Sequence, residues 1–131
     1  MSESAVATVS QLFERFGRDG LEQALELLSE DFVVEVPGSL SAEPDVYEGH
    51  DGARRYFAGF DGLMEDVRFE PIEIVDHGEA VIVWLRLSGR GAASGIEVEQ
   101  HAAVVNWVEG GKVTRMEPYP DMDEAREALR G

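Results

Sequence analysis

The residues best suited to chemistry in this chain of 131 residues stand together in one short segment, Glu97-Val98-Glu99-Gln100-His101. Successive side chains of a β-strand point to opposite faces, so a strand here places Glu97, Glu99 and His101 on one face. Glu99 would then orient His101, whose imidazole titrates near neutral pH and can act as a base. The alternative is a solvated acidic patch with His101 as a hydrogen-bonded wall residue, because Glu is mostly exposed in folded proteins.

A metal site is not expected at this segment. Neighbouring side chains on one face of a strand lie about 7 Å apart, which is long for shared ligation, and a clustered pair of histidines is missing. The other histidines and the acidic residue before the C-terminal segment have simpler interpretations. We expect His50 and Asp121 to cap helices and His77 to lie exposed in a turn.

Hydrophobic spacing predicts the elements that must position these residues. Helices are predicted over 6–16, 21–28, 51–61 and 121–131. Strands are predicted over 32–36, 67–76, 79–88, 95–108 and 112–120, with a surface loop over 38–50. Glycine turns at 77–78 and 110–111 make antiparallel hairpins. The order predicts one α+β domain over residues 1–131, an antiparallel sheet with helices packed on one face.

Two of the predicted strands are apolar on both faces, although helices on one side of a sheet should leave the other side polar. Apolar residues assigned to the second face include Ile82, Trp84, Val98 and Val104. We therefore predict a homodimer that packs sheet to sheet, with these four residues near the interface. The alternative is that the strands curl tightly on themselves.

Composition narrows the range of partners. The chain has 27 acidic and 11 basic residues, a formal net charge of −16, which opposes nucleic acids and anionic lipids. A ligand is therefore expected to be neutral or cationic. The chain has no Cys, which excludes disulfides, thiolate metal sites and a Cys nucleophile. With no long apolar run and no basic segment near Met1, we expect a cytoplasmic protein without membrane contact.

Several short motifs occur in an order and at spacings that together indicate a fold. They are LFERF (12–16), LLSEDF (27–32), VEVPG (34–38), YEGHDG (47–52), GKV (111–113), RME (115–117) and YPD (119–121). With them the chain resembles the SnoaL-like branch of the nuclear transport factor two-like superfamily. The resemblance implies a cone-shaped curved sheet with helices on its concave face (a cystatin-like α+β barrel), usually dimeric, that encloses a hydrophobic pocket.

The resemblance also implies a range of activities. Members include polyketide cyclases, steroid isomerases, epoxide hydrolases, dehydratases and non-catalytic binding proteins, and none of these activities needs a redox cofactor. The enzymes use carboxylates inside the cone as acids or bases. Their positions, as aligned, hold Phe13, Val36, Ala103 and Pro118 in this chain. The usual carboxylates are therefore absent, and the alignment puts the face of His101 inside the cone.

These arguments together predict a pocket for a small neutral hydrophobic molecule, without cofactor or metal. The expected lining consists of Phe13, Val36, Tyr56, Phe60, Ala103, Met116 and Pro118, with Tyr47 as a lid and polar contacts from Glu99, His101 and Tyr56. Two functions stay open. One is a cofactor-free acid–base enzyme of the cyclase, isomerase or dehydratase type, with His101 as base and Glu99 as its orienter. The other is a non-catalytic ligand-binding or dimerisation module.

Overall fold

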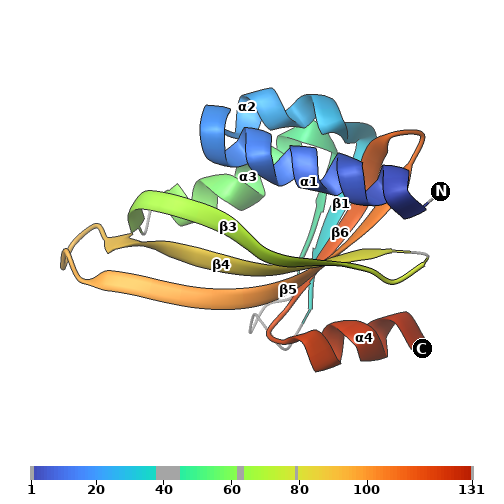
Figure 1. Cartoon of the computed structure of the whole chain (residues 1–131). Helices are drawn as coiled ribbons and strands as arrows, with labels where there is room; N and C mark the ends of the chain where they lie inside the picture. Colours follow the sequence, from blue (N-terminus) through green and yellow to red (C-terminus); the bar gives the residue numbers. More distant parts are fainter. Residues whose placement is uncertain (1, 38–44, 62–63, 79, 131) are drawn as a thin grey trace.

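In the computed structural model, residues 2–37, 45–61, 64–78 and 80–130 are described. The helices are α1 (Ser2–Asp19), α2 (Leu21–Ala24), the 3-10 helix η1 (Leu25–Leu27), α3 (Gly49–Asp61) and α4 (Met122–Arg130). The strands are β1 (Leu28–Val36), β2 (Asp45–Glu48), β3 (Met64–Asp76), β4 (Val81–Gly91), β5 (Glu97–Glu109) and β6 (Lys112–Tyr119). Figure 1 shows α1, α2 and α3 on one face of a curved sheet and α4 on the other.

The α+β class is confirmed, but the sheet is mixed rather than antiparallel throughout. Its strand order is β2-β1-β6-β5-β4-β3. β1 runs parallel to β6, with Val34 opposite Met116, while the other neighbours are antiparallel. Hairpin turns force antiparallel pairing, but β1 and β6 are joined through most of the chain, so no turn constrains their relative direction.

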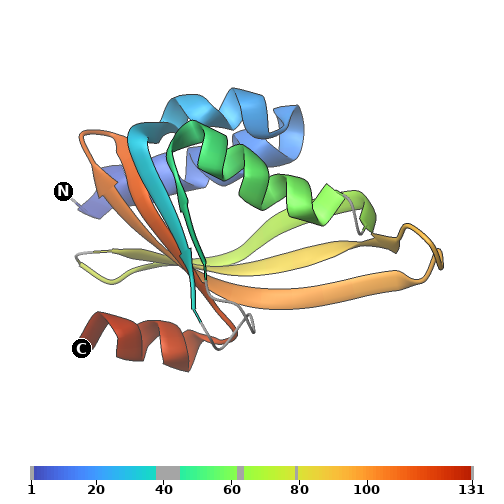
Figure 2. The same ribbon diagram turned by 180° about the vertical axis from the view of Figure 1, so that it is seen from behind.

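β2 lies in the segment that the sequence predicts to be a loop. Its four residues pair with the end of β1, with Tyr47 opposite Val34, and form the edge of the sheet (Figure 2). Turn-forming residues dominate the sequence around it, and so short a strand has too little periodicity to be recognised. The predicted turn at Gly110 and Gly111 is confirmed: both have positive φ, 61° and 79°, as a tight hairpin turn requires.

The main core lies between the concave face of the sheet and the helices α1 and α3. Val9 of α1, Phe32 and Val34 of β1 and Val83 of β4 are completely buried in it. The curvature that makes room for this layer accompanies breaks in pairing register along β3, between Glu65 and Arg68 and again near Pro71. Such bulges bend a strand. In the described part of the chain, no helix is long and apolar enough to cross a membrane.

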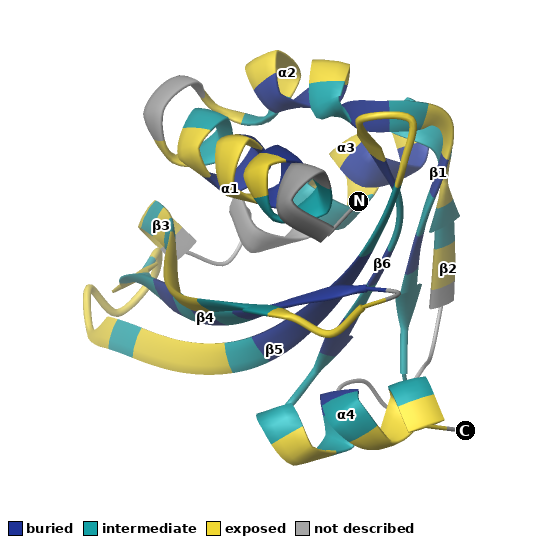
Figure 3. Cartoon of the chain, turned by 45° about the vertical axis from the view of Figure 1, so that its right-hand side comes forward, coloured by how far each residue is buried: buried dark blue, intermediate teal, exposed yellow. Residues whose placement is uncertain are grey.

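The second face of the sheet is covered in part by α4. Ile82, Ala103 and Val105 are completely buried there against Ala125 of that helix. Figure 3 shows β5 buried along its half near α4 and exposed along the half that extends beyond it. Helix α4 of the same chain therefore covers part of the face that we predicted a second copy of the protein would cover.

The four residues predicted at a dimer interface do not share one face. Ile82 and Trp84 pack in the cluster beneath α4, but Val104 faces the helices on the concave side. Val98 lies six residues before Val104 in an unbroken register and so shares its face. The prediction of which face of β5 turns toward the helices was therefore wrong. The homodimer stays a prediction, and native mass spectrometry tests it.

The C-terminal helix begins as predicted, with Asp121 as its N-cap. The Oδ1 atom of Asp121 accepts a hydrogen bond of 2.8 Å from the backbone N–H of Glu124. Asp121→Ala should therefore lower the free energy of unfolding by about 1 kcal/mol, measured by urea denaturation. The control is Asp123→Ala, which removes an exposed carboxylate from the same helical turn. Equal losses in the two variants would contradict the capping role.

Candidate functional site

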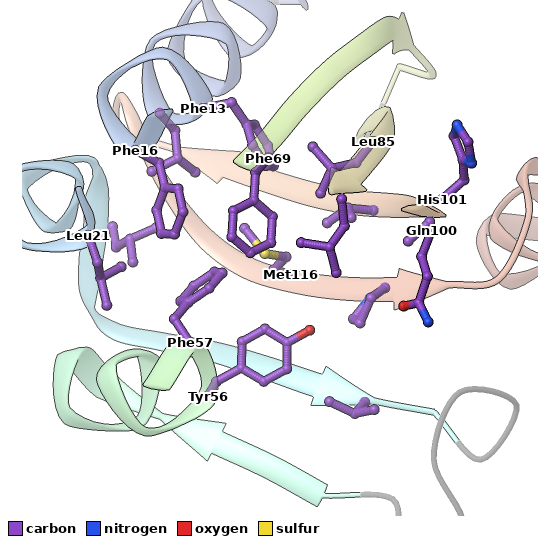
Figure 4. A pocket seen from close by; sticks show the side chains of 17 residues that line it. Phe13, Phe16, Leu21, Tyr56, Phe57, Phe69, Leu85, Gln100, His101 and Met116 are labelled. Atoms are coloured by element: carbon purple, nitrogen blue, oxygen red, sulfur yellow. The ribbon is translucent and has the colours of Figure 1, made fainter. Parts of the chain in front are cut away.

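A hollow of about 280 Å³ lies between the concave face of the sheet and the helices α1 and α3 (Figure 4). It is lined by Leu12, Phe13, Phe16, Leu21, Leu28, Val36, Tyr56, Phe57, Phe69, Leu85, Leu87, Gln100, His101, Ala102, Val104, Met116 and Pro118. No Asp, Glu, Lys or Arg is among these lining residues. The volume lies near the lower end of the range for small-molecule sites, about 300–1,000 Å³.

One end of the hollow is a cluster of aromatic rings from three elements. Phe16 of α1 packs against Phe57 of α3 at 4.9 Å and edge-on against Phe69 of β3 at 4.8 Å between ring centroids. Phe57 in turn meets Tyr56 edge-on at 5.0 Å. These are favourable aromatic geometries, so the cluster gives this end of the hollow a stable apolar wall.

Tyr56 brings a polar atom to this apolar wall. Its hydroxyl is directed into the hollow (Figure 4). Burial raises the pKa of Tyr56 to about 12, with a smaller contribution from neighbouring Tyr47. The phenol is therefore neutral across the physiological pH range and can donate a hydrogen bond to a ligand.

The opposite end of the hollow is more polar and more open. Gln100 of β5 lies there, exposed, on the far side from Phe16 and Phe57 (Figure 4). It stands opposite Leu87 of β4, which also lines the hollow. A neutral amide can both donate and accept hydrogen bonds. The hollow thus has an aromatic end and an end with neutral polar groups.

Five of the predicted lining residues lie where the resemblance puts them, namely Phe13, Val36, Tyr56, Met116 and Pro118. Tyr47 is not part of the lining, because its ring packs against Tyr56 at 5.3 Å, with the Arg55 guanidinium 5.4 Å from its centre. Ala103 lies on the opposite face of the sheet, in the cluster beneath α4. The side chain of Phe60 lies outside the described part of the chain.

The predicted acid–base pair is not inside the cone. Glu99 and His101 do share a face of β5, but it is the outer face, the same that buries Ala103. The His101 ring stacks on Trp84 at 5.3 Å with 17° between the planes, and Glu99 lies 3.7 Å from Arg86. His101 borders the edge of the hollow, with its ring turned away from the centre (Figure 4).

Sequence reasoning missed much of the lining, including Phe16, Phe57, Phe69, Leu85, Leu87, Gln100, Ala102 and Val104. One signal was available in β4. Its odd-numbered positions stay apolar from Val81 to Leu87, whereas the even-numbered positions turn polar at Arg86. The longer apolar stripe marks the face that is covered along its whole length. Because Ala102 is opposite Leu85, this stripe also identifies the inner face of β5.

The imidazole of His50, at the start of α3, is engaged with the backbone of β1. His50 contacts the carbonyl oxygen of Leu28 through Nε2 at 3.0 Å, which ties the start of α3 to β1. Among the described residues, no group of three or more His, Asp or Glu is placed to hold a metal ion.

On the outer face, Arg115 is ion-paired with Glu35 and donates a hydrogen bond of 2.6 Å to Glu117. Glu117 also accepts a hydrogen bond of 2.6 Å from the Tyr119 hydroxyl. Burial, followed by this contact with Glu117, raises the pKa of Tyr119. The network joins β1 to β6 and takes no part in the hollow.

The fold and site define a class: a cone of mixed sheet and helices that surrounds a ligand-sized hollow. The model of the SnoaL-like domain matches residues 9–116, so the chain belongs to this family, within the NTF2-like superfamily. No curated protein matches the chain significantly in sequence.

Solved structures share the fold at low sequence identity. An NTF2-like protein of unknown function from Burkholderia pseudomallei is 21% identical, with a TM-score of 0.75 and 98% of each chain covered. SalBIII, an epoxide hydrolase/cyclase-like enzyme in pyran ring formation in the polyether salinomycin, is 21% identical with a TM-score of 0.74, covering 94% of this chain and 96% of its own. TerC, co-crystallised with polyporic acid, is 18% identical with a TM-score of 0.75, covering 98% and 99%.

Proposed function

We propose that this protein binds a small, neutral, largely apolar molecule in the hollow between α1, α3 and the concave face of the sheet. The observation that carries the proposal is the lining, which is mostly apolar, contains no Asp, Glu, Lys or Arg among the described residues, and includes an aromatic cluster from three elements. Burial of apolar ligand surface against such walls supplies the driving force. The volume of about 280 Å³ suits a molecule of one or two rings better than a four-ring skeleton.

A second candidate function is turnover of the same ligand by cofactor-free proton transfer. The Tyr56 hydroxyl favours it, because a neutral phenol in an apolar site can polarise a carbonyl group. The fold relative SalBIII is described as an epoxide hydrolase/cyclase-like enzyme. Binding remains the primary proposal, since none of the described residues that line the hollow carries a carboxylate and the imidazole of His101 stacks on the outer face.

The test is a calorimetric titration with tetralin, a neutral two-ring hydrocarbon. We expect saturable binding of one tetralin per chain, with a negative change in heat capacity because apolar surface is buried. Absence of binding up to the solubility of tetralin, and of its ketone analogue β-tetralone, would refute the proposal. Incubation of β-tetralone with the protein in deuterated water, followed by NMR, separates the two functions: accelerated exchange beside the carbonyl would establish proton transfer.

The outward position of Glu99 gives a prediction of its own. Glu99→Gln should leave the affinity for tetralin unchanged within about twofold, because the carboxylate lies beside Arg86 on the outer face and is screened by water. The measurement is the same titration. A loss of affinity greater than about tenfold would mean that Glu99 contributes to the ligand site as the sequence predicted.

A further inference from the structure

The two neutral polar side chains of the hollow point to a more specific class of ligand. We propose that Tyr56 and Gln100 select a molecule with an apolar ring at one end and an uncharged hydrogen-bond acceptor, such as a ketone, at the other. This inference rests on the proposed function and deepens it. The ring lies against Phe16, Phe57 and Phe69, and the carbonyl oxygen is directed toward Tyr56 and Gln100.

The orientation follows from how the walls differ. Aromatic side chains from α1, α3 and β3 gather at one side of the hollow, and Gln100 lies at the other (Figure 4). A ligand entering with its carbonyl first would bury that oxygen among Phe16, Phe57 and Phe69, which offer no hydrogen bond. An unsatisfied buried carbonyl is costly, so the ring-first orientation is preferred.

Tyr56 supplies the donor on the α3 side. Its hydroxyl faces the hollow, and the surrounding apolar side chains hold the phenol in its neutral, proton-donating form. Gln100 supplies an amide N–H on the β5 side, on the same face as Ala102 and Val104 of the wall. A carbonyl oxygen can accept a hydrogen bond from either donor, and its second lone pair leaves room for a further hydrogen bond.

The lining of the hollow also disfavours a ligand that carries a carboxylate. A carboxylate entering the hollow would lose its hydration without meeting a Lys or Arg among the described lining residues, and the ring of His101, at the edge, is turned away from the centre (Figure 4). The net charge of −16 opposes the approach of an anion as well. The site therefore discriminates between a ketone and a carboxylate of the same size.

Three probes with one skeleton test this discrimination by calorimetry: β-tetralone, tetralin and tetralin carboxylate. The expected order is β-tetralone about tenfold tighter than tetralin, with the carboxylate weakest. Tyr56→Phe should weaken β-tetralone about fivefold to tenfold and leave tetralin unchanged, because only the hydroxyl is removed. Gln100→Leu should act in the same direction by a smaller factor, since the amide is exposed to competing water.

Tyr119→Phe is the matched control, because it removes the same atom from a tyrosine on the outer face. It should leave the affinities for all three probes unchanged. Equal binding of β-tetralone and tetralin, tighter binding of the carboxylate, or an equal effect of Tyr56→Phe on ketone and hydrocarbon would overturn the inference while the proposed function stands. Failure of all probes to bind would overturn both. Thermal melts verify folding, and exposed Gln100→Leu keeps the test decisive if Tyr56→Phe unfolds.

Discussion

Ala102→Trp should abolish binding of tetralin and β-tetralone while leaving the protein folded. Ala102 lies in the wall of the hollow on β5, opposite Leu85 on β4, and both side chains face inward. An indole at this position occupies a large part of the volume of about 280 Å³ and excludes a two-ring ligand. We expect the affinity to fall by more than about 100-fold, measured by calorimetry.

The same substitution should not unfold the protein. Overpacking a filled core costs about 1–3 kcal/mol, but here the added side chain enters existing space. The control is Ala58→Trp, which places an indole on the exposed side of α3, away from the lining. It should retain full affinity. Unchanged binding in Ala102→Trp, with a normal thermal melt in both variants, would show that the ligand does not occupy the hollow.

Asn106→Asp should destabilise the protein by about 3–5 kcal/mol near neutral pH. Asn106 is completely buried on β5, and its amide nitrogen donates to the carbonyl oxygens of Val81 at 3.3 Å and Val104 at 3.0 Å. A carboxylate of nearly the same shape loses both donated hydrogen bonds. It also places a negative charge against two carbonyl oxygens in a completely buried site, so the folded state is strongly disfavoured.

The loss of stability should depend on pH in a defined direction. Burial and the facing carbonyls raise the pKa of the introduced carboxyl above its unfolded value of about 3.9. The folded state then holds its proton more tightly than the unfolded state. The destabilisation relative to the parent is therefore smallest below about pH 4 and grows as the pH rises through the folded pKa.

Urea denaturation of Asn106→Asp at acid and neutral pH measures this effect. The matched control is Gln100→Glu, the same amide-to-carboxylate change on the same strand but at an exposed position. It should alter the free energy of unfolding by less than about 0.5 kcal/mol. An Asn106→Asp variant as stable at neutral pH as the parent would contradict the buried position of this side chain.

Most of the fold could be predicted from local patterns. Hydrophobic spacing and turn residues identify the helices and the long strands because both are determined by neighbouring residues. β2 could not be predicted from local patterns, because this strand of four residues is stabilised mainly by its pairing with β1. The parallel pairing of β1 with β6 could not be predicted either, because it joins residues far apart in the sequence, such as Val34 and Met116.

The candidate site was predicted in part, and mainly through the resemblance. Phe13, Val36, Tyr56, Met116 and Pro118 lie in the lining because the family fold positions the elements that carry them. Gln100 was overlooked because its face of β5 was taken for the outer one. Within the segment from Glu97 to His101, the face of Val98 and Gln100 carries no charged side chain, and this local difference was not used to assign the inner face.

By itself the sequence determined which side chains of β5 share a face, because strand alternation is a local property of the backbone. Glu99 and His101 are together, as predicted, and so are Gln100, Ala102 and Val104. Only the tertiary structure decided which set faces the hollow. That choice depends on where α1, α3 and α4 pack, and α4 buries Ala103 and Val105 on the outer face. Gln100, Ala102 and Val104 therefore face the hollow, and the pair Glu99 and His101 does not lie at its centre.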